Sequence, residues 1–212
     1  MSTNDILTAH VWRALCRMRC AQVGVDLESE GSGLDEVMTC CWRACNIRDR
    51  TEPKLGAGYF GNGVVTLPTE MSVRDLCDRL SIVEVALRLR NTLQQHGSAE
   101  GVAALTDWKL KGVRLGGVKP GLRFDSKALS FIVSSWLFPW EHVRFARATP
   151  TPTSQSSRAS MPLCFGHGLL NPMVCVLSRR AETVGGGVDV WYCSPRDALM
   201  GFVEHLQKSI AV

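Results

Sequence analysis

The order in which helical and strand-like patterns follow one another limits this chain to a mixed α/β fold. Apolar residues recur at helical spacing in residues 4–18, 72–96, 98–110 and 195–206. Strand-like runs occupy residues 36–46, 63–67, 129–138, 172–178 and 187–193. The two kinds of segment do not alternate regularly, as they do in a doubly wound sheet. We therefore expect an α/β fold with a mixed β-sheet and helices packed on one of its faces.

Two of the helical patterns give specific expectations for boundaries and buried faces. Asn4 is the expected cap of the first helix. The longest helix is expected to begin at Ser72 and to run without interruption to about His96. Its buried face is expected to carry four aliphatic residues at helical spacing, Leu76, Leu80, Val83 and Leu87.

Length, composition and charge limit the classes of protein to consider. The 212 residues suit a single domain spanning 1–212, with a flexible Pro/Ser/Thr-rich excursion at about 149–162. The net charge is only +4, and no basic stripe indicates a nucleic-acid partner. No apolar run reaches the length of a membrane span, and the first residues lack the pattern of a signal peptide. These features predict a soluble, cytoplasmic protein.

Nine cysteines in a chain of this size favour free thiols in a reducing compartment. Cys40, Cys41 and Cys45 lack the paired spacing of a zinc site and lie in a strand-like run. Cys16 and Cys20 lie one turn apart on the first predicted helix. We therefore expect all five thiols to pack in the core, and we expect no metal site.

The glycine-rich stretch GAGYFGNG, residues 56–63, raises the question of whether it forms a binding loop or a turn. Its four glycines favour positive φ and a close approach of the backbone. Tyr59 and Phe60 are expected to contribute packing area. This combination favours a structural corner, with contact to a substrate as a secondary role.

The five histidines give no strong catalytic signal of their own. His10 lies on an apolar stripe and is expected to be a core histidine, and His205 is expected to be solvated. His142 and His167 lie near predicted loops and are candidate site residues, although a structural role is favoured for both. The segment HGSAEG places Glu100 four residues after His96, so that the acid could orient a basic imidazole. It also lies where a helix is expected to break, which favours a capping role.

Five motifs resemble, in order and spacing, the C-terminal half of the BAHD superfamily of acyl-CoA-dependent acyltransferases. They are STNDILTAHVWRAL, CNIRDR, GAGYFGN, VSSWLFPWEHVRF and the strand pair ending in GVDVWYC. The resemblance implies one half of a chloramphenicol acetyltransferase-like fold, in which two α/β halves enclose the active site. It implies acyl-CoA as co-substrate, no tightly bound cofactor, and a small-molecule acceptor with a hydroxyl or an amine.

The resemblance also assigns candidate residues. Ser134, Ser135 and Trp136 match the strand beside the acceptor pocket. The structural signature comprises Arg48, Arg50, Tyr59, Phe60, Gly61, Asn62 and Phe145. Of the family's Asp-Phe-Gly-Trp-Gly signature only Phe145 survives. In the family the aspartate of this signature pairs with an arginine, which corresponds here to Arg48 or Arg50, and Arg144 stands in place of that aspartate.

The family's catalytic His-x-x-x-Asp-Gly motif belongs to its N-terminal half, and no histidine of this chain has aspartate four residues later. No catalytic residue is therefore assigned, and the N-terminal half of the same enzyme is the expected partner. We expect the 212 residues alone to be inactive. Two other functions stay open. A non-catalytic acyltransferase-like interaction protein would explain the missing histidine, whereas a thiol-dependent metal or redox protein has only the cysteine count in its favour.

Overall fold

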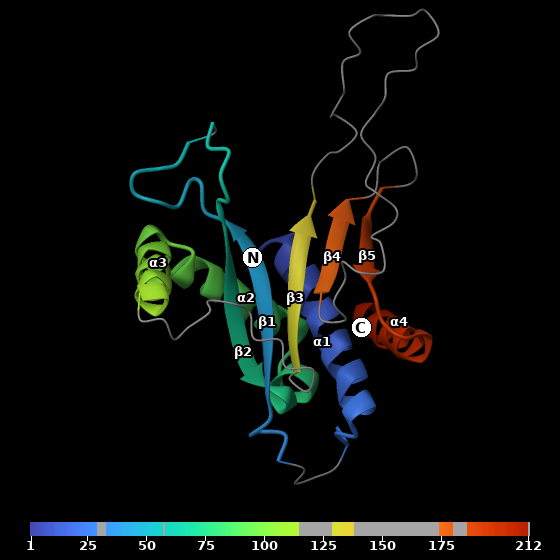
Figure 1. Cartoon of the computed structure of the whole chain (residues 1–212). Helices are drawn as coiled ribbons and strands as arrows, with labels where there is room; N and C mark the ends of the chain where they lie inside the picture. The colour runs from blue at the N-terminus through green and yellow to red at the C-terminus, as the bar shows by residue number, and fades with distance from the viewer. Residues whose placement is uncertain (29–32, 57, 115–128, 138–173, 180–185, 212) are drawn as a thin grey trace, which may run out of the picture. The chain divides into compact units, whose positions relative to one another are not determined.

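The computed structural model describes residues 1–28, 33–56, 58–114, 129–137, 174–179 and 186–211 (Figure 1). The helices in this part of the chain are α1 (Thr3–Val23), the short π-helix η1 (Asp75–Arg79), α2 (Ile82–His96), α3 (Ala99–Arg114) and α4 (Arg196–Ile210). The strands are β1 (Met38–Asn46), β2 (Val64–Ser72), β3 (Leu129–Trp136), β4 (Val174–Arg179) and β5 (Val188–Tyr192). The segment 149–162 lies outside the described residues, so its expected flexibility stays a prediction.

The strands form a mixed sheet in the order β2-β1-β3-β4-β5. β1 pairs with β2 in antiparallel and with β3 in parallel orientation, and β4 and β5 are antiparallel. The predicted α/β class with a mixed sheet is confirmed. The chain divides into two compact units, one made of residues 1–133 and 194–212 and the other of residues 134–193.

In the first unit, one face of β1 is buried against α1 and α2. Alternate residues of a strand point to the same face, and Thr39, Cys41, Arg43 and Cys45 are all buried. The indole Nε1 of Trp12 on α1 donates to Thr39 Oγ1 at 3.0 Å, and this hydroxyl donates to Leu129 O at 2.7 Å. A single buried hydroxyl thus connects the helix, the central strand and the adjacent strand. The expected core positions of Cys40, Cys41 and Cys45 are confirmed.

The ends of α1 follow from local sequence signals. Ser2, rather than the expected Asn4, is the N-cap residue, and Asp5 completes a capping box with it. Gly24 ends the helix in the left-handed conformation with φ of 74°, which glycine adopts without the steric cost of a side chain. The error at Asn4 shifts the helix start by less than a turn.

The predicted continuous helix from Ser72 to His96 is wrong. β2 extends through Ser72, η1 follows, and Leu80 is extended with φ of −89° and ψ of 138°. Ser81 then starts α2 with a second capping box, in which Glu84 N donates to Ser81 Oγ at 3.2 Å. The interruption rotates the buried face, so that Val85, Ala86 and Leu89 are buried whereas Val83 and Leu87 are exposed.

The helices at the other edge of this unit enclose a small apolar cluster. Cys45, Val65 and Leu67 from β1 and β2 pack with Ile47, Leu93 and Leu105. α2 and α3 therefore cover the outer part of the strand pair. None of the helices in the described ranges combines the length and the apolar character that crossing a bilayer requires.

Two phenylalanines test this assignment of core and surface. Phe131 on β3 is buried, whereas Phe60 in the glycine-rich stretch is fully exposed. We expect Phe131→Ala to lower the free energy of unfolding by ~3–5 kcal/mol, because it removes buried surface and leaves a cavity. Phe60→Ala should change it by less than ~0.5 kcal/mol. Urea unfolding of both variants measures the difference, and equal effects would contradict the assignment.

Candidate functional site

The acceptor-pocket candidates lie at the end of β3, in the second unit. Ser134, Ser135 and Trp136 are all half-buried. Trp136 Nε1 donates to Ser134 Oγ at 3.1 Å, which places these two side chains on one face of the strand and Ser135 on the other. The Ser134 hydroxyl is therefore oriented by the indole and keeps its own O–H for donation to another group.

The signature residues around the glycine-rich stretch lie in the first unit, where Arg48 holds the turn. Its Nη2 donates to Gly61 O at 3.1 Å and its Nε donates to Tyr59 O at 3.3 Å. Asn62 Oδ1 accepts from Val64 N at 3.1 Å, which supports the entry into β2. A Cβ atom at Gly63 would lie 2.9 Å from Arg48 Cγ, so glycine permits the close approach of this side chain.

Two expectations for this stretch hold only in part. Of its four glycines only Gly56 has a positive φ, 74°. Phe60 is fully exposed and contributes no packing area, whereas Tyr59 is 39% exposed. The Tyr59 ring lies against Gly61, where an added Cβ atom would come within 2.5 Å of Tyr59 Cζ. The turn is held mainly by backbone carbonyls that accept from Arg48, and burial of the Phe60 ring has no part in it.

Arg50 connects the same corner to the end of α2. Its Nη1 donates to Gly97 O at 2.8 Å, directly after the last helical residue, where a cation is favoured by the exposed carbonyls of the helix end. Asp49 forms no ion pair with Arg48 or Arg50 in the described part of the chain. Arg144 and Phe145 lie outside the described residues, so their expected place near this corner stays a prediction.

A buried ionic cluster, which the sequence analysis missed, joins α1, β1 and α2. Asp5 is 1% exposed, and its Oδ1 accepts from Arg43 Nη1 at 2.9 Å. Its Oδ2 accepts from Arg90 Nε and Nη2 at 2.9 and 2.6 Å and from Ser2 N at 2.7 Å. Arg43 Nη2 also donates to Leu89 O at 2.5 Å. Each charged group of the cluster thus has a partner, as burial requires.

The balance of forces at this cluster lowers the pKa of Asp5. Burial by itself raises the pKa, but hydrogen bonds from Arg43, Ser2 and Arg90 favour the charged carboxylate and bring it to about 2. The capping signal Ser-x-x-Asp in STND could have identified Asp5 as an N3 residue. Arg43 within an apolar strand gave the second signal, because a buried arginine needs an anionic partner.

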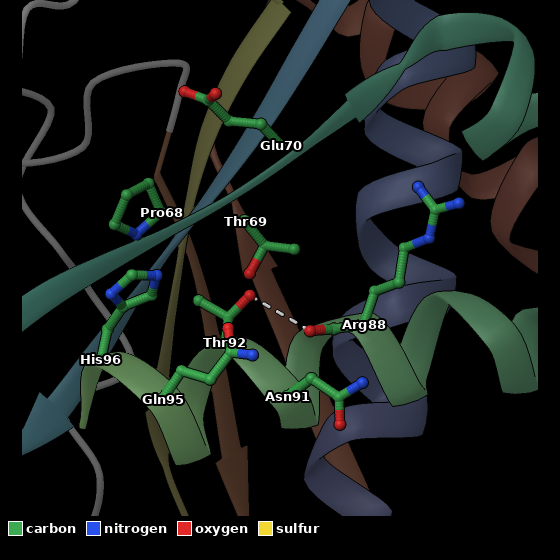
Figure 2. Close-up of a pocket in the computed structure, with 8 residues that line it drawn as sticks. All are labelled: Pro68, Thr69, Glu70, Arg88, Asn91, Thr92, Gln95 and His96. Carbon is green, nitrogen blue, oxygen red and sulfur yellow. Dashed lines mark hydrogen bonds between the residues drawn. The ribbon is translucent and has the colours of Figure 1, made fainter. Parts of the chain in front are cut away.

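A polar pocket with a volume of about 410 Å³ opens between β2 and α2 (Figure 2). Its lining residues are Pro68, Thr69, Glu70, Arg88, Asn91, Thr92, Gln95 and His96. The Thr69 hydroxyl is buried and has no hydrogen-bond partner, whereas Thr92 Oγ1 donates to Arg88 O at 3.1 Å. Figure 2 shows Thr69 pointing toward the α2 side chains, so the pocket wall carries an unsatisfied hydroxyl.

The candidate pair His96 and Glu100 is not brought together. α2 ends at His96, Gly97 is its C-cap residue, and Glu100 lies in the first turn of α3. Within the described residues, no hydrogen bond or ion pair joins the imidazole to this carboxylate. The interpretation of HGSAEG as a helix break is confirmed.

The other histidines have structural surroundings where they are described. His10 Nδ1 lies 2.7 Å from Ser209 Oγ on α4, and burial together with Arg13 lowers its pKa. His205 is half-buried rather than solvated, and burial lowers its pKa as well. His142 and His167 lie outside the described residues. In the described ranges no group of three His, Cys, Asp or Glu side chains is placed to hold a metal ion.

Comparison with known proteins identifies the class. A model of the Transferase family matches residues 1–209, and the chain belongs to this family of BAHD-type acyltransferases. The curated O-acetyltransferase astG of Aspergillus oryzae is 36% identical over 75 residues, which are 34% of this chain and 14% of the relative. The predicted resemblance to the superfamily is thus confirmed.

Solved structures share the fold over nearly the whole chain. Vinorine synthase superposes with a TM-score of 0.58 and 17% identity, covering 98% of this chain and 42% of its own. TRI101 of F. sporotrichioides, in complex with coenzyme A and T-2, gives a TM-score of 0.64 and 18% identity over 100% of this chain and 44% of its own. The chain therefore spans less than half the length of the structures it matches.

The charge of Asp5 makes a testable contribution to stability. Its pKa of about 2 lies below the value near 4 expected in an unfolded chain, so protonation favours unfolding. The contribution, of about 2 kcal/mol, is complete above pH ~5 and is lost as the pH falls toward 2. We expect Asp5→Asn to remove this part of the pH dependence of the free energy of unfolding.

The control for that titration is Asp35→Asn, which changes an exposed acid paired with Arg79. Exposed pairs contribute ~0–1 kcal/mol, so this variant should keep the slope of the wild-type protein. Denaturant unfolding at several pH values from 6 to ~3 gives the three slopes. Parallel curves for wild type and Asp5→Asn would show that Asp5 is not held as described.

Proposed function

We propose that this chain is the C-terminal part of an enzyme that transfers an acyl group from acyl-CoA to an acceptor hydroxyl or amine. The observation that carries the proposal is the family match over residues 1–209. Two further findings support it: an O-acetyltransferase among the relatives and a coenzyme A complex among the structures of the same fold. We also place the reaction in the cytoplasm, where the free thiols of the described residues stay reduced.

In this proposal the general base comes from a part of the enzyme beyond these 212 residues. Proton transfer from the acceptor requires an imidazole oriented by a second group. His96 has no such contact with Glu100, and His10 is engaged with Ser209. The deprotonated acceptor then attacks the thioester carbonyl, and coenzyme A leaves as the thiol. The residues described above serve to build one wall of the substrate channel.

Within that wall we assign acceptor binding to the end of β3. Trp136 fixes the Ser134 hydroxyl by donating to its oxygen, which leaves the serine proton for an acceptor oxygen or nitrogen. Ser135 points to the opposite face of the strand and provides a matched comparison. Arg48 and Arg50 have a different role in this scheme, because their side chains are used in holding the corner and the end of α2.

The complete enzyme tests this assignment through Ser134→Ala and Ser135→Ala. We expect Ser134→Ala to raise the KM for the acceptor by ~2–10-fold, which corresponds to the loss of one neutral hydrogen bond. The KM for acetyl-CoA should stay the same, and Ser135→Ala should change neither value. Steady-state kinetics with an alcohol that the enzyme acylates gives the KM for the acceptor and the KM for acetyl-CoA. A larger effect of Ser135→Ala would move the acceptor to the other face of β3.

The 212 residues alone should be inactive in the same assay. With acetyl-CoA and a set of small alcohols and amines, we expect no release of free thiol above the rate without protein, because general base catalysis contributes ~10²–10⁴-fold. His96→Ala serves as the control and should leave this result unchanged. Turnover that disappears in His96→Ala would instead make His96 the base and would place the active site in this chain.

A non-catalytic acyltransferase-like interaction protein is the second candidate function. It is favoured by the absence of a His-x-x-x-Asp motif from the sequence and by the four changed residues of the Asp-Phe-Gly-Trp-Gly signature. Sequencing of the full transcript separates the two functions. An upstream reading frame that encodes His-x-x-x-Asp-Gly supports the enzyme, whereas an in-frame stop codon directly before Met1 supports the interaction protein.

A further inference from the structure

Three buried thiols meet where α1 packs against η1. Cys16 and Cys20 lie one turn apart on α1, and Cys77 lies in the middle of η1. Their exposed fractions are 0%, 0% and 3%. The thiols of Cys20 and Cys77 lie close enough to that of Cys16 to raise its pKa. The contact between Cys16 and Cys77 joins segments that are far apart in the sequence.

Two arginines of α1 fix η1 against this cluster. Arg13 Nε donates to Leu76 O at 2.7 Å, and its Nη2 donates to Leu80 O. Arg17 Nη2 donates to Cys77 O. These contacts hold the backbone of the π-helix, including the carbonyl of Cys77, against the turn of α1 that carries Cys16, and they place two guanidinium groups beside the thiols.

The two sulfur atoms differ in their electrostatic surroundings. The hydrogen bond from Cys16 lowers the pKa of Cys77 despite its burial, and the charges of Arg17 and Arg13 act in the same direction. The hydrogen bonds that Cys16 makes with Cys20 and Cys77, together with burial, raise its pKa. Cys77 is therefore the better nucleophile of the pair. By contrast, burial raises the pKa of Cys40 and Cys175 to about 12.

We propose that Cys16 and Cys77 form a reversible disulfide when the protein is oxidised by a peroxide. The Cys77 thiolate attacks one oxygen of hydrogen peroxide, the O–O bond breaks, and Cys77 becomes a sulfenic acid. The other oxygen leaves as hydroxide and becomes water by taking up the proton that the Cys77 thiol released. The Cys16 sulfur then attacks the sulfenic sulfur, and the second water leaves. Two thiols are oxidised to one disulfide, and one peroxide is reduced to two waters.

Access to Cys77 is provided by the element that carries it. η1 has only five residues, is followed by the extended Leu80, and has exposed neighbours at Asp78 and Arg79. A short segment of this kind opens at a lower free energy than the central strands. The disulfide would join η1 covalently to α1 and close a long loop that includes β1 and β2, which stabilises the folded chain.

Trypsin separates the three cysteines, so peptide mapping identifies the bond directly. Cleavage after arginine places Cys16 in residues 14–17, Cys77 in residues 75–79, and Cys20 in a peptide that begins at Cys20 itself. The 212-residue chain is treated with hydrogen peroxide in native buffer, its remaining thiols are alkylated, and it is digested without reductant. Cys20→Ser and Cys77→Ser are treated in parallel.

We expect residues 14–17 linked to residues 75–79 as the dominant product of Cys16. The link should disappear on reduction, persist in Cys20→Ser and be absent from Cys77→Ser. Oxidation should also raise the Tm of the wild type and of Cys20→Ser. Recovery of both peptides alkylated and unlinked from oxidised, folded protein would overturn the proposal, as would a dominant link between Cys16 and Cys20. The wild-type map decides the question even if Cys77→Ser does not fold.

Discussion

The buried carboxylate of Asp5 is the constraint on which the first unit depends. It accepts from Arg43 on β1 and from Arg90 on α2, while it also caps the helix to which it belongs. Two guanidinium groups and one carboxylate are costly to bury, so the three elements must bring them together with correct geometry. Removal of one partner leaves an uncompensated buried charge, whereas an exposed pair such as Arg79 with Asp35 contributes little.

The ionic cluster sets the position of β1, and two further arginines hold the corner that follows this strand. Arg43 is fixed within the strand. Five residues later, Arg48 donates to the carbonyls of Tyr59 and Gly61, so its side chain is used to hold the turn. Arg50 then reaches the end of α2, the helix that Arg90 anchors from within. The arginines of β1 and its extension therefore determine both where the glycine-rich turn begins and where α2 ends.

The sequence predicted the elements whose patterns depend on burial alone. β1 and β3 are apolar runs that lie next to each other inside the sheet, and their buried residues made both strands recognisable. β2 was predicted too short, because Pro68 and Glu70 interrupt its apolar pattern, and β2 lies at the edge of the sheet that the described strands form. The expected long helix included η1, because Leu76 and Leu80 continue the helical spacing of α2. The extended Leu80 separates the two helices.

Much of the candidate site could not be predicted, since it depends on contacts between distant residues. The family resemblance located Arg48, Arg50 and Ser134, but nothing local shows that Arg48 would bind carbonyls or that Phe60 would be exposed. The pairing of Asp5 with Arg43 and Arg90 spans 38 and 85 residues of sequence, and the contact between α1 and Cys77 is equally remote. Periodicity identifies a buried face, but it does not identify the partner across it.

A double-mutant cycle between Asp5 and Arg43 tests the central claim most directly. Urea unfolding of Asp5→Asn, Arg43→Met and the double variant gives the coupling free energy of the pair. If the carboxylate and the guanidinium depend on each other as described, the double variant should be more stable than the sum of the single effects by ~1–3 kcal/mol. Additive effects, equal within ~0.5 kcal/mol, would show that the two residues act independently and would contradict the account.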